Sequence, residues 1–191
     1  GLAFWAGIPW TLKMPIGHLV DLIWRRKALL VYFGASLLAL SILIMYGIIA
    51  HTSAMAAVMK VEVWFVISTI LAPTGYVLQD VVADAMTVEA VPTIDEHGNT
   101  YPERDIKIMH VTMQTLGRIA IIGGFVAVSL LNVTLFDGIE DMDEAAKIDV
   151  YANIYLLALI VPLVSILGVI LGGILLRRRA RQMEAQGLDH S

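Results

Sequence analysis

Long uninterrupted apolar runs constrain this chain more than any other feature. Residues 28–59, 119–136 and 150–176 contain no Asp, Glu, Lys or Arg. A bilayer hydrocarbon core about 30 Å thick needs roughly 20 apolar residues of helix to cross it. Because the runs are continuous and do not alternate every second residue, they predict transmembrane helices and not the strands of a β-barrel.

We expect five spans, and therefore an all-α, polytopic transmembrane helix bundle with the lipid bilayer as its first partner. The polar stretch 177–191 reads as a cytoplasmic basic linker, and the chain begins inside an apolar run without a Met. We therefore expect it to be a piece of a longer protein. The predicted spans cover residues 1–17, 28–50, 61–88, 108–136 and 150–176.

Composition excludes several other classes of protein. The chain is 58% hydrophobic and 16% charged, whereas soluble domains carry about 25% charged residues. It has no Cys, which excludes a disulfide-stapled domain and a cysteine-ligated metal domain. Its net charge of −4 is not the basic balance that binding of nucleic acid requires.

Basic residues predict the orientation, because they gather on the cytoplasmic side of membrane proteins. The outer connections hold only Lys60 and Lys147 if the first span runs from outside to inside. The acidic segment 137–144 then lies outside, which the rule tolerates because carboxylates contribute little to it. The connections predicted to be cytoplasmic hold Arg25, Arg26 and Lys27, then Arg104 and Lys107, then Arg177, Arg178, Arg179 and Arg181.

The first inner connection combines a glycine, an aspartate and a basic cluster. Gly17 permits a tight turn, and Asp21 can cap the next helix, whose first backbone N–H groups lack partners. Arg25 and Arg26 can anchor at the anionic inner leaflet. This connection resembles the gating loop between helices two and three of the major facilitator superfamily. An anchor that only obeys the positive-inside rule is the alternative.

Three short motifs follow one another on the predicted spans in an order that narrows the resemblance. Together they are similar to the folate–biopterin transporter family of that superfamily, over its helices two to six, which belong to the N-terminal half. The motifs consist of Pro9, Trp10, Lys13, Pro15, Gly17 and Asp21, then Asp80, Val81, Val82, Asp84 and Ala85, then Gly117 and Arg118 before Gly123 and Gly124.

Four ionisable residues fall within the predicted spans, namely Lys13, Asp80, Asp84 and Arg118. Charges inside a membrane are costly and are usually paired or functional. Depths at about 1.5 Å of rise per residue favour pairing Asp80 with Arg118 and Asp84 with Lys13. Asp80 and Asp84 share a helix face, so either is a candidate for proton coupling. Charge pairs that only hold helices together are the alternative.

Other positions on the spans carry weaker expectations. His110, Gln114 and Arg118 form one polar stripe, which lines a cavity or faces a neighbouring helix. Small residues four apart, at Gly168 with Gly172 and at Ala120 with Gly124, predict close approach of helices or a dimer interface. Pro162 is expected to bend or loosen its helix.

The resemblance implies a secondary transporter, a proton symporter that works by alternating access in a bacterial inner membrane. Its solute would be an anionic or pterin-like molecule, and the remaining helices of a twelve-helix carrier would be required partners. A non-transporting scaffold, assembly factor or accessory subunit of a larger, for example photosynthetic, membrane complex is the alternative. We expect no enzyme, no metal and no cofactor, because no nucleophile–base pair, metal-ligand spacing or phosphate loop is evident.

Overall fold

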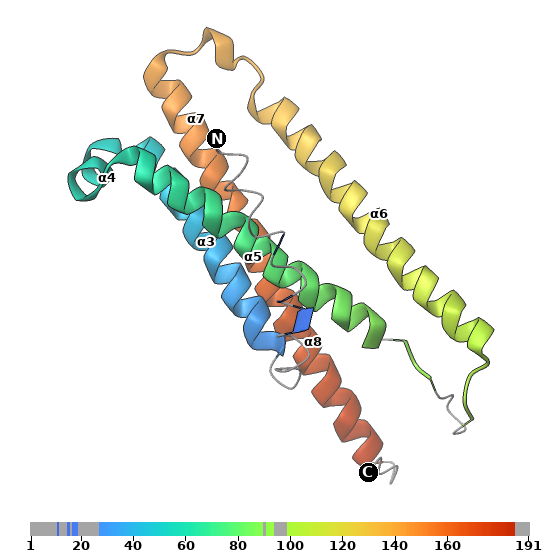
Figure 1. The fold of residues 1–191 in the computed structure, drawn as a ribbon. Coiled ribbons are helices and arrows are strands. Elements are labelled where there is room, and N and C mark those ends of the chain that lie inside the picture. The colour runs from blue at the N-terminus through green and yellow to red at the C-terminus, as the bar shows by residue number, and fades with distance from the viewer. Residues whose placement is uncertain are drawn as a thin grey trace.

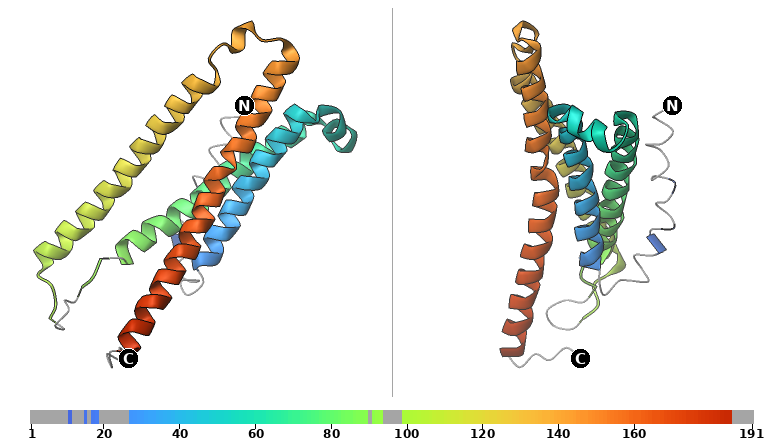
Figure 2. Two further views of the ribbon diagram at one scale, coloured as in Figure 1. Left: turned by 180° about the vertical axis from the view of Figure 1, so that it is seen from behind. Right: turned by 90° about the vertical axis from the view of Figure 1, so that its left-hand side faces the viewer.

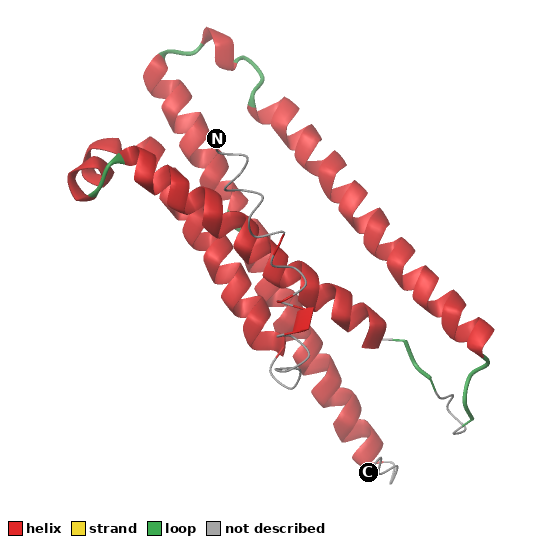
Figure 3. Ribbon diagram, in the orientation of Figure 1, coloured by secondary structure: helices red, strands yellow, loops and turns green. Residues whose placement is uncertain are grey.

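The computed structural model describes residues 11, 15, 17, 18, 27–89, 91–93 and 99–185. These residues form helices and connecting loops, with no strand in the described part of the chain (Figures 1 and 3). The elements in order are α3 (Lys27–Ala50), α4 (Thr52–Val58), α5 (Val61–Glu89), α6 (Glu103–Leu135), the short 3-10 helix η2 (Ile139–Asp141), α7 (Glu144–Ala158) and α8 (Ile160–Ala185). The predicted all-α class is confirmed.

Four helical segments are long and apolar enough to cross a membrane: Ala28–Ala50, Val61–Val88, Glu103–Asp141 and Glu144–Leu175. They coincide with four of the five predicted spans. The remaining span, 1–17, falls outside the described residues except at Thr11, Pro15 and Gly17. Successive long helices run in opposite directions, so that the connections alternate between the two ends of the bundle (Figure 2).

Several helices extend beyond the apolar runs because the helix dipole, capping and helix propensity, and not hydropathy alone, set where they end. Helix α6 starts five residues before the predicted span, with Glu103 and Asp105 in its first turn, where carboxylates favour the helix dipole. The Asp143 carboxylate caps α7 by accepting a hydrogen bond from the Ala146 amide at 2.7 Å. Toward the C-terminus, α8 continues to Ala185, so the segment 177–191, which was predicted as a linker, begins as helix. Its Arg, Ala, Gln and Met residues are good helix formers.

Pro162 interrupts the long rod formed by α7 and α8, as expected. Proline lacks the N–H that would bond to the carbonyl of Ala158, and its ring crowds that carbonyl. Helix α7 accordingly ends at Ala158, and α8 begins at Ile160. The rod nevertheless keeps its overall direction and packs along α3 (Figure 2).

The core lies where α3 crosses α5, with α8 packed beside them. Val77 and Val82 are fully buried there, together with Val31 and Val81, and Val169 of α8 packs against this cluster. Helix α6 stands apart from the bundle, and its main contact is with α5 (Figure 1). No residue of α6 is buried.

The closest approach of two helices occurs at Gly34 of α3 and Gly75 of α5. A Cβ added at Gly75 would lie 2.5 Å from the carbonyl oxygen of Gly34 and 2.9 Å from the backbone nitrogen of Leu38. A Cβ added at Gly34 would lie 2.8 Å from the carbonyl oxygen of Gly75. These distances leave no room for any side chain, so the crossing requires glycine on both helices.

The small residues singled out from the sequence behave differently. A Cβ added at Gly168, Gly172 or Gly124 would meet no atom within 4 Å. Within the described residues these glycines therefore do not bring two helices close together, and the alternative of a dimer interface stays a prediction. Spacing identifies small residues, but the partner that comes close is decided by which helices cross and where.

A pair of serines forms a hydrogen-bonded link inside the same helix pair. Ser41 of α3 and Ser68 of α5 are each only 3% exposed. Their hydroxyl oxygens lie 2.8 Å apart, and each hydroxyl is within reach of the other residue's carbonyl oxygen, at 3.0 and 3.1 Å. This link satisfies both hydroxyls in a region that excludes water.

The coupling free energy between Ser41 and Ser68, measured with the Ser41→Ala and Ser68→Ala variants, is expected to be about 0.6 kcal/mol and at most about 1.7 kcal/mol. This is the range found for hydrogen bonds between membrane helices. A double-mutant cycle on the free energy of unfolding in lipid bicelles measures this coupling. Ser36→Ala is the matched control, because the Ser36 hydroxyl donates only within α3, to the Tyr32 carbonyl. A coupling of zero would contradict the link.

Candidate functional site

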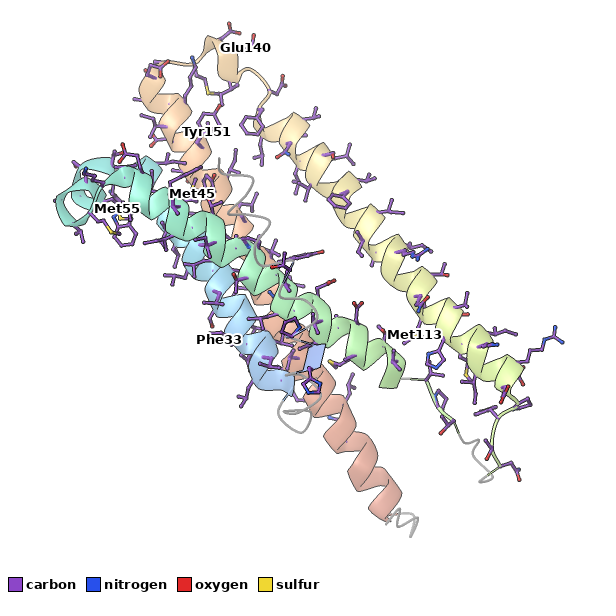
Figure 4. The ribbon with its side chains drawn as sticks, viewed as in Figure 1. Phe33, Met45, Met55, Met113, Glu140 and Tyr151 are labelled. Carbon is purple, nitrogen blue, oxygen red and sulfur yellow. The ribbon has the colours of Figure 1, made fainter. Side chains whose placement is uncertain are left out.

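The last turns of α5 and the first half of α6 border an open cleft of about 430 Å³. Met113 projects from α6 toward the end of α5 at this point (Figure 4). The lining combines charged, amide and apolar side chains on two helices that belong to predicted membrane spans. The residues are Asp84, Thr87, Val88, Met113, Gln114, Gly117, Arg118 and Ile121.

Among the described residues, Arg118 supplies the only cation of the cleft lining. It follows the first residue of α6 by fifteen residues, or about 22 Å of helix, and directly precedes the uncharged run 119–136. Its side chain is exposed to the cleft. Among the described residues it forms no ion pair. The guanidinium therefore presents its five N–H donors to whatever enters the cleft.

Asp84 is the carboxylate that shares the cleft with Arg118. Asp80, one turn earlier on α5, is half-buried and does not line the cleft, and both carboxylates have interaction partners. No ion pair joins Asp80 to Arg118, so that predicted pairing is wrong. The prediction from depth assumed that α5 and α6 lie side by side along their whole length. In the structure they approach each other only near the end of α5 (Figure 1).

The polar stripe of α6 is divided between two surroundings. Gln114 and Arg118 line the cleft, one turn apart. His110, a further turn earlier, is half-buried but does not line it. The helical periodicity thus correctly grouped Gln114 with Arg118, and the cleft ends before it reaches His110.

Most of the predicted gating loop falls outside the described residues, namely Asp21, Arg25 and Arg26. Lys13, the predicted partner of Asp84, also lies outside them. Gly17 is described, in helical conformation and half-buried. A Cβ added there would lie 3.9 Å from Cγ1 of Val81. The loop glycine is therefore adjacent to α5 at the residue that follows Asp80.

Thr87, Met113 and Gly117 complete the cleft and were not singled out as site residues from the sequence. Thr87 follows Asp84 by three residues, and its hydroxyl donates to the Asp84 carbonyl at 2.7 Å. Met113 and Gly117 each precede a residue of the polar stripe by one position. A search for neighbours of that stripe on α6 could have found them, but it could not have identified the facing turn of α5.

The described residues hold no group of three His, Asp or Glu side chains arranged to bind a metal ion. No family model, curated protein or solved structure matches the chain. The resemblance to folate–biopterin transporters thus rests on the three sequence motifs.

Proposed function

We propose that this chain is part of a secondary membrane transporter that resembles the folate–biopterin carriers of the major facilitator superfamily. The observation that carries the proposal is the cleft in which Arg118 and Gln114 of α6 face Asp84 of α5. Charged residues on membrane helices usually mark a solute or ion pathway when they line a cavity. Two such residues, Asp84 and Arg118, together with the Gln114 amide around one opening favour transport over a purely structural role.

The chemistry of the cleft suits an anionic solute with a planar, hydrogen-bonding ring. The Arg118 guanidinium can bind a carboxylate through two parallel hydrogen bonds. The Gln114 amide offers both a donor and an acceptor, as a pterin ring requires. Met113 and Ile121 supply apolar surface against which such a ring can pack. Asp84 is our candidate for the proton-coupling group.

Alternating access in carriers of this kind rocks one helical repeat against another around a central site. The chain would therefore act together with further helices of the same protein. The proposed orientation has the start of α3, the start of α6 and the end of α8 in the cytoplasm of a bacterium, because the basic residues gather at those ends. The acidic segment around η2 would lie on the opposite side.

Uptake of labelled folate and labelled biopterin into cells that express the full-length protein tests the proposal. Saturable uptake of either compound, abolished by a protonophore, is the expected result. Asp84→Asn is expected to remove the dependence on the proton gradient, whereas Asp143→Asn, at the opposite end of the bundle, should leave it intact. Uptake no greater than that of cells without the protein would contradict a folate or biopterin carrier.

A membrane scaffold or accessory subunit is the second candidate, and the exposure of α6 favours it. Phe125 and Val133 on α6 are 71% and 72% exposed, so the second half of this helix has apolar surface available to a partner. Comigration of the full-length protein with a larger complex in native gels, without uptake of either solute, would favour this candidate. Uptake by a protein that migrates alone would contradict it.

A further inference from the structure

A second opening, an apolar cavity of about 390 Å³, lies between α3, α5 and α8. It borders a different face of α5 from the cleft that contains Asp84. Its lining is dominated by Val31, Val82, Met86, Gly168, Gly172 and Gly173. The cavity thus lies beside the bundle's valine core but is not filled by it.

The two polar side chains of the lining are directed to their own helices. The Gln79 amide lies 3.4 Å from the Gly75 carbonyl oxygen, and the Ser165 hydroxyl lies 3.4 Å from that of Val161. The described residues of the lining include no carboxylate, guanidinium or ammonium group that a polar solute would need. Apolar cavities of this kind exclude water and accept hydrocarbon.

The wall formed by α8 is open because its glycines have no close neighbours. A Cβ added at Gly168, Gly172 or Gly173 would meet nothing within 4 Å. From Ser165 to Gly173 this wall extends over about 12 Å of helix. The opening is thus elongated along the helix axis, as an extended hydrocarbon chain requires.

The end of the cavity nearest the start of α3 is adjacent to a concentration of positive charge. Ala28, which lines the cavity, directly follows Lys27. Gly173 precedes the basic cluster of α8 by about one turn, and the described side chain in that cluster, Arg178, is exposed. The cluster consists of Arg177, Arg178, Arg179 and Arg181. Basic groups between helices at the cytoplasmic side favour anionic lipid headgroups.

We propose that this cavity holds an acyl chain of an anionic phospholipid whose phosphate is bound near the end of α8, where Arg178 is exposed. Hydrocarbon surrounds helices that cross a membrane, so an apolar opening between them fills with a lipid tail. The positive charge near this end of the cavity favours a lipid whose headgroup is negatively charged. This site requires the membrane location of the helices and does not depend on the proposed transport.

The test measures lipid retained by the purified full-length protein, using phosphatidylglycerol and phosphatidylcholine with identical acyl chains and native mass spectrometry. Preferential retention of phosphatidylglycerol is expected. Gly172→Leu should lower its retention at least about tenfold, the effect of excluding about two methylene groups. Neutralising Arg177 and Arg178 with Gln should weaken it by about fivefold per residue, with phosphatidylcholine unaffected.

Gly124→Leu is the matched control, because Gly124 is equally open but lies on α6, outside the cavity. It should retain phosphatidylglycerol as the unsubstituted protein does. Gly168→Leu repeats the test if Gly172→Leu does not fold. Misfolding of both variants would contradict the open space that the structure shows beside these two glycines. Equal retention of the two lipids, or unchanged retention in the leucine variants, would overturn the proposal.

Discussion

The Gly75→Leu variant is expected to lose the packed crossing of α3 and α5. A leucine Cβ at this position would lie 2.5 Å from the Gly34 carbonyl oxygen, and backbone cannot rotate away as a side chain can. Overpacking of this kind costs about 3 kcal/mol. Glycine itself disfavours a helix by about 1 kcal/mol, so the substitution should destabilise the protein by about 2 kcal/mol net. Unfolding by SDS titration in bicelles measures this free energy.

Gly123→Leu provides the control for this experiment. It makes the same chemical change on a helix, but a Cβ at Gly123 meets nothing within 4 Å. Only the gain in helix propensity remains there, so the variant should be as stable as the unsubstituted protein or slightly more stable. Equal effects of Gly75→Leu and Gly123→Leu on the free energy of unfolding would show that the Gly34–Gly75 crossing does not hold the bundle together.

Arg118→Gln is expected to reduce uptake by the full-length protein about 10- to 100-fold, since hydrogen bonds to a charged group contribute about 1.5–3 kcal/mol. The glutamine keeps donor groups at the cleft but removes the charge and the two-pronged geometry. Arg118 has no ion pair among the described residues. Its replacement therefore does not deprive any of their carboxylates of a counter-ion. Initial uptake rates over a range of solute concentrations measure the effect.

Arg104→Gln is the control for the Arg118 experiment. Arg104 lies in the first turn of α6, exposed and outside the cleft, so uptake should be unchanged. Surface expression of each variant is measured in parallel, so that uptake is expressed per folded protein. Normal uptake by a well-expressed Arg118→Gln variant would exclude a transport role for this residue.

The cleft shows where prediction from the sequence succeeded and where it did not. Helical periodicity alone grouped Gln114 with Arg118, because residues four apart always share a face. The partner carboxylate was misassigned to Asp80, since depth along one helix gives no information on where a neighbouring helix approaches. Asp84 borders the cleft because α5 reaches α6 only with its last turns.

Hydropathy by itself determined that this chain forms long helices suited to a membrane and where four of them run. That property belongs to each segment alone, because the cost of burying polar groups in lipid is summed over neighbouring residues. Only the tertiary structure decided that Gly34 and Gly75 touch while Gly168 and Gly172 line a cavity. The segments around these glycines are apolar on every side, so their composition contains no signal for which face meets which partner. The crossing geometry between distant segments decides it.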